Sequence, residues 1–239
     1  MVALLAFDTA TERIGLALQV GVRVWSHDAA GGAQASLALL PALHRLLAEA
    51  GIGLRGLDAI AFGRGPGAFT GLRTACAVAQ GLAFGAGLPV LPLDTLMAVA
   101  EDARLQGAAS PLWVVMDARM GEIYAAEYDH DGRAGSGWHT LTPPRLTTPE
   151  ALNAGWAVAP PQALAGSAIA AFGDRLLAGP AALFPAALPT GRALLPLGAA
   201  LWAQGGAVDA ALALPLYLRD KVALTTAERA AIATAKVLG

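Results

Sequence analysis

The loop at residues 63–68 combines residue types and a spacing that could bind an anion. Gly63, Gly65 and Ala68 fit the pattern Gly-x-Gly-x-x-Ala of dinucleotide-binding loops, and the loop lies between a short apolar run and a helix rich in small residues. In such a turn, the backbone N–H groups of Gly65, Gly67 and Ala68 can form an anion-binding nest. The same turn also suits a closely packed structural elbow, so the local sequence leaves both interpretations open.

Two further tests argue against a nucleotide cofactor at this loop. A dinucleotide site requires an acidic residue about 20 positions after the glycines, but residues 74–93 carry no charge and Asp94 comes late. A Walker-type loop requires Gly-Lys-Ser/Thr, and the chain's lysines are Lys221 and Lys236. A generic phosphate or anion site in residues 63–68 therefore remains as the alternative to the structural elbow.

Other catalytic chemistries find no support in the residue pattern. No two histidines stand four residues apart, so no His-x-x-x-His pair can share a helical face around a metal ion. Cys76 is the single cysteine, which excludes an internal disulfide and a cysteine-based zinc site. Gly-x-Ser-x-Gly is absent, and Ser167 has no histidine placed by the sequence to activate it. We expect neither catalytic nor metal-binding residues.

Composition limits the remaining classes of function. The 239 residues suffice for two lobes or one large domain. A net charge of −2 with scattered arginines offers no basic stripe to a nucleic-acid backbone. Although 56% of the residues are hydrophobic, glycines and prolines interrupt the long apolar stretches, so none resembles a membrane span of about 20 residues. The first apolar run, 2–7, is too short for a signal peptide, and a cytoplasmic protein is expected.

Hydrophobic periodicity predicts the elements that hold the glycine loop. Three consecutive strands joined by short turns indicate an antiparallel meander, and helices then alternate with short buried strands. The predicted order is βββαβαβα. The strands are expected at 2–7, 13–20, 22–27, 57–62 and 89–93, and the helices at 36–50, 68–84 and 95–104.

From residue 112 the pattern starts again. An apolar strand ends in Asp117, which stands in the same local setting as Asp8 after the first strand. The strand and glycine at Gly63 are echoed at Gly166, and a candidate helix follows each of them. These echoes indicate a duplicated lobe, and chance similarity between apolar strands is the alternative.

The duplication divides the chain into two expected lobes. The first, at 1–106, is expected to bind a partner, and the second covers 107–239, with helix 192–204 as a candidate to return to the first lobe. Residues 178–191 contain three prolines and are predicted to cross without regular structure. A capping box at Thr225-x-x-Glu228 predicts a final helix.

Three segments and a short tail carry the most specific motifs. They are FDTATERIGLAL (7–18), GRGPGAFTGLRTACAVAQGLAFGAGLPVLPLDTL (63–96), DARMGEIYAAEY (117–128) and the Leu-Tyr-Leu-Arg tail at 216–219. Together they resemble the bacterial TsaB family, also called YeaZ. The resemblance covers the whole first lobe, the start of the second and the tail.

The resemblance implies both a fold and a pathway. The implied fold is α/β and actin-like (ASKHA, ribonuclease H-like), built from two duplicated βββαβα-type lobes. The implied function is formation of threonylcarbamoyladenosine at position 37 of tRNAs that read codons beginning with A. In that system TsaD transfers the threonylcarbamoyl group, TsaE is an ATPase, and TsaB supports TsaD without being catalytic. The resemblance thus implies TsaD and TsaE as partners, a homodimer when alone, tRNA contact through the complex, and ATP/ADP and Mg²⁺ bound by partner subunits.

Asp8 occupies the position that contacts Mg²⁺ in an actin-like ATPase, and Asp117 is its echo. Active members of that superfamily carry glycine and hydroxyl residues in the first turn, so that backbone amides approach phosphate. Here the turn has no glycine, and Glu12 would repel phosphate oxygens. We therefore expect Asp8 and Asp117 to be structural. The chain also lacks the histidine that many family members carry near Ala35, so any role of that histidine is in doubt here.

The helix after the glycine loop is predicted to form an interface, because its small residues let another backbone approach closely. Glycines inside a helix cost about 0.5–1 kcal/mol each relative to alanine, so they call for a packing reason. Packing on helix 36–50 is one reason, and in the TsaB family this surface serves homodimers and the TsaB–TsaD pair. Arg73 is a cation near the positive helix end and is expected to pair with a carboxylate of this chain or of a partner. The predicted interface residues are Leu39, Leu43, Leu46, Leu47, Gly71, Leu72, Arg73, Ala75 and Ala79.

Two other functions compete with the scaffold hypothesis. An actin-like kinase or ATPase would bind and turn over nucleotide alone, and a nucleotide-binding assay separates it from a scaffold. A peptidase is the other alternative, which the missing nucleophile motif disfavours. We therefore expect a non-enzymatic partner of TsaD, with no cofactor of its own and no membrane association.

Overall fold

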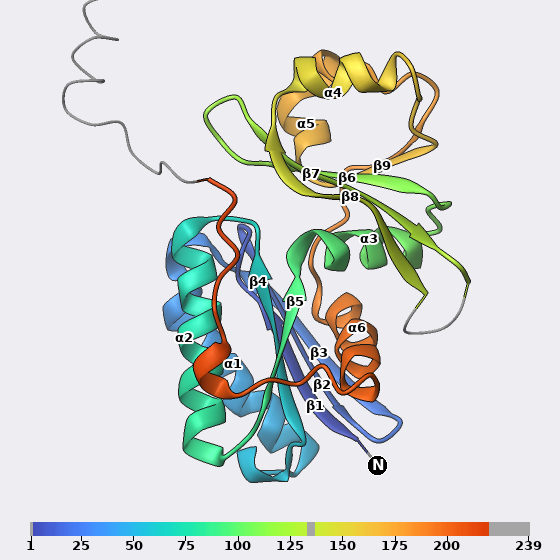
Figure 1. Ribbon diagram of the computed structural model, residues 1–239. Coiled ribbons are helices and arrows are strands. Elements are labelled where there is room, and N and C mark those ends of the chain that lie inside the picture. Colours follow the sequence, from blue (N-terminus) through green and yellow to red (C-terminus); the bar gives the residue numbers. More distant parts are fainter. Residues whose placement is uncertain (1, 133–136, 220–239) are drawn as a thin grey trace, which may run out of the picture.

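The computed structural model describes residues 2–132 and 137–219, which form two lobes, each built on one sheet (Figure 1). The first lobe opens with the predicted meander and then alternates helices with strands. Its elements are β1 (Ala3–Asp8), β2 (Arg13–Val20), β3 (Arg23–Ala30), α1 (Ala35–Ala50), β4 (Ala59–Gly65), α2 (Phe69–Ala86), β5 (Val90–Asp94) and α3 (Thr95–Leu105), with short 3-10 turns at Gly32–Gln34 and Leu54–Gly56.

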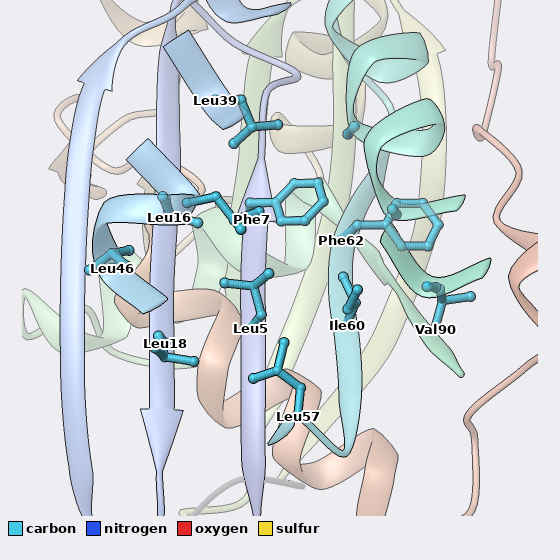
Figure 2. Close-up of a cluster of buried hydrophobic side chains, with 14 of the residues drawn as sticks. Leu5, Phe7, Leu16, Leu18, Leu39, Leu46, Leu57, Ile60, Phe62 and Val90 are labelled. Atoms are coloured by element: carbon cyan, nitrogen blue, oxygen red, sulfur yellow. The ribbon is translucent and has the colours of Figure 1, made fainter. Parts of the chain in front are cut away.

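The first sheet is covered by helices on both faces. Its strand order is β3-β2-β1-β4-β5, and β1 pairs antiparallel with β2 and parallel with β4. All of β1 is buried, as expected for a strand with a core on each side. Leu5 and Phe7 pack beneath α1 and α2 (Figure 2), whereas Leu4 and Ala6 pack against α6 (Gly191–Ala203) on the opposite face.

The second lobe repeats this connectivity with shorter elements. Its sheet has the order β10-β9-β6-β7-β8, in which β6, β7 and β8 form an antiparallel meander and β9 and β10 are parallel to β6. The prediction of an α/β actin-like fold with two duplicated lobes is confirmed. The elements are β6 (Leu112–Asp117), β7 (Ile123–His130), β8 (Trp138–Thr147), α4 (Pro149–Trp156), β9 (Ala163–Ala165), α5 (Ala168–Phe172), a 3-10 turn (Gly173–Arg175) and β10 (Ala182–Phe184).

The sequence did not predict two strands of the second lobe, β8 and β10. β8 contains Pro143 and Pro144, which usually mark turns, but it lies at a sheet edge where missing N–H donors are tolerated. The prediction that 178–191 lacks regular structure is wrong for β10, because three residues there pair in parallel with β9 and are too few to show periodicity. The predicted capping box at Thr225 and Glu228 lies outside the described residues.

Two helices connect the lobes. α3 buries Leu96 and Val99 against the second sheet, while Ala98 packs with α6 on the first. α6 follows the second lobe in sequence yet packs on β1 and β2. No helix in residues 2–132 and 137–219 is long and apolar enough to cross a membrane.

Candidate functional site

Asp8 lies at the end of β1 and is sealed inside the protein. Its side chain is fully buried, its Oδ1 accepts the Ala10 N–H at 2.6 Å, and its Oδ2 accepts the Thr95 hydroxyl at 2.6 Å. A side chain at Gly63 would overlap the Asp8 carboxylate, so β4 needs glycine there. Burial raises the pKa of Asp8 to about 6, against the two hydrogen bonds, which favour the ionised form.

The glycine loop is a packing elbow. Gly65 has a φ of +113° and donates its N–H to Thr95 Oγ1 at 3.2 Å. The Ala68 N–H donates to the Ala10 carbonyl at 2.8 Å, and a side chain at Gly67 would collide with Ala10. The anion-nest interpretation is therefore wrong for Gly65 and Ala68, because their N–H groups already have partners inside the chain.

The first turn does not fit a magnesium–nucleotide complex. Both Asp8 oxygens are used inside the chain, and no path leads from the solvent to a side chain with no exposed surface. Thr9 turns its hydroxyl away to the Gly71 carbonyl at 2.7 Å. The polar groups of the turn therefore link β1 to α2 and α3.

A cleft of about 430 Å³ separates the first turns of the two lobes. Arg119 bridges it: its guanidinium donates to Glu12 Oε1 at 3.0 Å and to Asp117 Oδ2 at 3.2 Å, and its backbone N–H donates to Asp117 Oδ1 at 2.8 Å. Arg119 and the next residue, Met120, have φ values of +63° and +56°, which residues other than glycine rarely adopt. Asp117 is therefore held in an ion pair at the cleft. Within residues 2–132 and 137–219, no three potential metal-ligating side chains come together.

Most of the predicted interface residues belong to the core of the first lobe. The four leucines of α1 and three residues of α2 are at most 5% exposed, and a side chain at Gly71 would overlap the Thr9 carbonyl. These residues pack α1 and α2 onto the sheet, so they leave little surface for a partner, and their role in an interface stays a prediction. The buried residues are Leu39, Leu43, Leu46, Leu47, Gly71, Leu72, Ala75 and Ala79.

Arg73 differs from the rest of the predicted set because it is exposed. It lies on a strip of α2 that faces solvent together with Ala77, Gly81 and Phe84, and Phe84 is 86% exposed. A side chain built at Gly81 or Gly85 would meet no described atom within 4 Å. Packing within the described chain therefore does not explain these two helical glycines. We call this strip, with Gly85, the α2 face.

Sequence inspection missed Phe84, although its position was informative. Residues 73, 77, 81 and 84 recur at helical spacing, so an exposed aromatic residue was predictable once the core stripe was known. Beside Phe84, a groove of about 920 Å³ runs between α2 and the 3-10 turn Ala210–Leu212. Ala77, Gly81 and Ala211 contribute to its lining.

Residues 213–219 form a C-terminal strap that runs beside α2 toward the junction of the lobes (Figure 1). The Leu216 N–H donates to the Arg64 carbonyl at 2.7 Å. The Tyr217 hydroxyl accepts a hydrogen bond from Arg73 Nε at 3.1 Å. Arg219 donates to Glu122 at 2.5 Å in the second lobe, so the strap touches both lobes.

Comparison with known proteins identifies close relatives of this chain. The family model for TsaD, tRNA N6-adenosine threonylcarbamoyltransferase, matches residues 28–153. The tRNA threonylcarbamoyladenosine biosynthesis protein TsaB of Escherichia coli is 32% identical over 92% of this chain and 96% of its own length, and TsaB of Haemophilus influenzae is 34% identical over 92% and 94%. The solved structure of YeaZ from Pseudomonas aeruginosa superposes with a TM-score of 0.82 and 39% identity, covering 91% of this chain and all of that one.

Proposed function

The chain belongs to the TsaB (YeaZ) family of tRNA threonylcarbamoyladenosine biosynthesis proteins, and we propose that it acts in this pathway as a non-catalytic partner of the transferase TsaD. TsaD would transfer the threonylcarbamoyl group to position 37 of tRNAs that read codons beginning with A, in the cytoplasm. TsaE would join the complex, and these partners would bind tRNA, ATP/ADP and Mg²⁺.

The observation that carries this proposal is the α2 face. An exposed phenylalanine and two helical glycines surrounded by open space lie on one helix. Each of these glycines costs the isolated chain about 0.5–1 kcal/mol of helix stability relative to alanine. A partner whose backbone approaches α2 closely would offset that cost, because glycine leaves room for contact and Phe84 supplies apolar area.

The family-model match supports TsaD as that partner. Its residues 28–153 include α1, β4 and α2, so TsaD-family chains are similar to this one in the elements that build the α2 face. Related chains can place equivalent helix faces against each other around an approximate two-fold axis. The same geometry would let two copies of this chain pair when TsaD is absent, so we propose that homodimer and TsaD complex exclude each other.

The geometry of the cleft supports a non-catalytic role. Asp8, the residue in the superfamily's magnesium position, has no exposed surface, and its oxygens bond to Thr95 and Ala10. Glu12 stands at the cleft beside Asp117, with Arg119 between them. This arrangement disfavours nucleotide phosphates, because two carboxylates share one arginine there.

The experiment compares two matched substitutions of exposed apolar residues. Phe84→Asp places a charge on the α2 face, and Val158→Asp, at a position 87% exposed in the second lobe, is the control. We expect Phe84→Asp to weaken TsaD binding, measured by calorimetry, by about thirtyfold or more. Val158→Asp should stay within about twofold of wild type.

A reconstituted modification assay then tests the function itself. TsaD, TsaE and tRNA are combined with wild-type chain, with Phe84→Asp or without the chain. Equal modification without the chain would overturn the scaffold role. ATP turnover by the purified chain alone would instead favour the actin-like ATPase alternative.

A further inference from the structure

We propose that Arg73 is the charged anchor of the α2 face, that it binds a carboxylate of the protein partner, and that Tyr217 of the strap positions it. This inference rests on the proposed function, because it assumes that a TsaD-type chain docks on α2. It adds the chemical group that the partner must present and a residue 144 positions away in sequence that prepares the site.

Two aromatic rings hold the Arg73 side chain in a fixed place. Its guanidinium carbon lies 3.8 Å from the centroid of the Phe69 ring, a cation–π contact. Its Nε donates to the Tyr217 hydroxyl at 3.1 Å, and the Phe69 and Tyr217 rings pack with centroids 5.3 Å apart. The two terminal nitrogens make no hydrogen bond with the described residues, so they form an ordered fork facing solvent. Such a fork matches the two oxygens of a carboxylate.

Arg73 has no carboxylate partner within the described residues, unlike three arginines that contact the C-terminal strap or belong to it. Arg64 pairs with Asp94 at 2.7 Å, Arg119 with Glu12 and Asp117, and Arg219 with Glu122. In the part of the chain that the structure describes, Arg73 has no such partner. It also lies one turn from the N-terminus of α2, where the helix dipole disfavours a cation. A carboxylate from another protein would pair with Arg73 and would offset its unfavourable interaction with the helix dipole.

The surroundings of Arg73 favour a protein carboxylate over an RNA phosphate. Arg73 is the single charged residue of α2, and its exposed helix neighbours include Ala77, Gly81 and Phe84. An RNA backbone is usually bound by several cations in a row. A single ordered arginine beside exposed aromatic and small residues is instead typical of the centre of a protein interface.

The strap positions Tyr217 from both sides. Before it, the Leu216 N–H bonds to the Arg64 carbonyl, and the Leu216 carbonyl passes so close to Gly65 that a side chain there would touch it at 3.0 Å. After it, Arg219 bonds to Glu122 and to the Arg119 carbonyl at 3.3 Å. Tyr217 is thereby held against Phe69, while 41% of its surface remains exposed beside the fork.

The test measures TsaD binding by calorimetry for four variants of the full chain. We expect Arg73→Ala to weaken binding about tenfold, because the ion pair is lost. Arg73→Glu should weaken binding at least about a hundredfold, because the new carboxylate also repels the carboxylate of the partner. Tyr217→Phe keeps the ring and removes the hydroxyl, and we expect a loss of about threefold with an unchanged melting temperature. Arg145→Glu is the control, since Arg145 is also an exposed arginine beside an aromatic ring, Trp113, but in the second lobe.

Two further measurements separate positioning from general structure. Tyr217→Phe should have no effect in an Arg73→Ala background, because the hydroxyl acts through the guanidinium. The salt dependence of binding should be weaker in Arg73→Ala than in wild type. An additive Tyr217→Phe loss would overturn the positioning role.

The outcomes also distinguish this inference from the function on which it rests. If wild-type chain does not bind TsaD, the proposed function fails. If wild type binds and Arg73→Glu binds equally well, the anchor is overturned while the function stands. If Arg73→Glu loses tRNA binding but keeps TsaD binding, the proposed carboxylate ligand of Arg73 is wrong, and an RNA phosphate is its ligand instead.

Discussion

The helices α2 and α5 occupy corresponding places in the two lobes but differ greatly in length. Each follows a parallel strand that ends near a glycine, Gly63 in the first lobe and Gly166 in the second. Both glycines are required by close contact, with the Asp8 carboxylate and with the Val115 carbonyl respectively. Yet α2 has 18 residues and α5 has 5. The elbow is thus a property of the fold, whereas the long helix is specific to the first lobe.

The two first turns differ in the same way. Asp8 is fully buried and bonded to Thr95 from α3, whereas Asp117 is partly exposed and paired with Arg119 at the cleft. In the first lobe the beginning of the turn, Asp8 to Ala10, is buried in the core, while Glu12 stays exposed at the cleft. In the second lobe Asp117 itself lies at the cleft. The same connectivity therefore buries one aspartate and leaves its counterpart at the cleft.

The largest expected effect tests whether the elbows are equivalent. Gly63→Ala forces a methyl group into the Asp8 carboxylate, and Gly166→Ala places one against the Val115 carbonyl at a φ of +110°. We expect each substitution to lower the free energy of unfolding by about 4 kcal/mol, because backbone or buried charge must move. Urea denaturation followed by circular dichroism measures both. If Gly166→Ala leaves the free energy of unfolding unchanged, the two elbows are not equivalent, since the second one does not require glycine.

The two aspartates should differ in how strongly they make stability depend on pH. Burial raises the pKa of Asp8 from its ordinary value of 3.8, which applies to the unfolded chain, to about 6 in the native protein. Between these values the native state binds more protons, so the contribution of Asp8 to stability falls as pH rises from about 4 to 6, by about 3 kcal/mol in all.

Asp8→Asn removes this titration. The difference in unfolding free energy between wild type and Asp8→Asn should therefore change by about 3 kcal/mol between pH 4 and pH 7, to the disadvantage of wild type at pH 7. Urea melts at several pH values measure it. At pH 7, Asp117→Asn breaks only a solvent-accessible pair and should cost less than about 1 kcal/mol. A constant difference for Asp8→Asn would mean that the carboxyl is better hydrated than its burial indicates.

These contrasts also show how far the sequence could be interpreted. The strand and helix periodicities, together with the echoes at Asp117 and Gly166, were sufficient to predict two lobes of the same connectivity, because burial on both faces leaves long apolar strands. The short strand β10 was missed, since three residues carry no periodic signal.

The candidate site was harder to predict than the fold. Spacing of three or four residues identifies a helical stripe but does not tell whether the stripe faces the core or a partner. The leucines of α1, such as Leu39 and Leu43, were therefore assigned to an interface although they are buried. Arg73 was identified by a different argument, its unfavourable place near a helix N-terminus. Tyr217 was noted only as part of the tail motif at 216–219, and its contact with Arg73 was missed because a contact across 144 residues leaves no local pattern.

The C-terminal strap links the two lobes through its last residue. Arg219 is 15% exposed at its side chain and pairs with Glu122, which lies beside the turn that carries Arg119. We expect Arg219→Ala to lower the free energy of unfolding by about 2 kcal/mol, a typical net value for a hydrogen bond to a charged group. Thermal melting measures the change. Arg175→Ala is the control, since Arg175 pairs with Glu150 within the second lobe, and it should have a smaller effect.

The smallest expected effect comes from the glycines of α2, compared with a glycine of α4 in the second lobe. Gly81→Ala and Gly85→Ala add a methyl group where nothing described lies within 4 Å, so each should raise the free energy of unfolding by about 0.5–1 kcal/mol. Both should at the same time weaken TsaD binding, because the methyl group occupies the space that a close helix would need. Gly155→Ala in α4 is the control: it also has open space around it, and it should stabilise the chain without affecting the partner. If both α2 variants gain stability and bind TsaD as wild type does, the glycines serve no contact and the two lobes are more alike than their helices indicate.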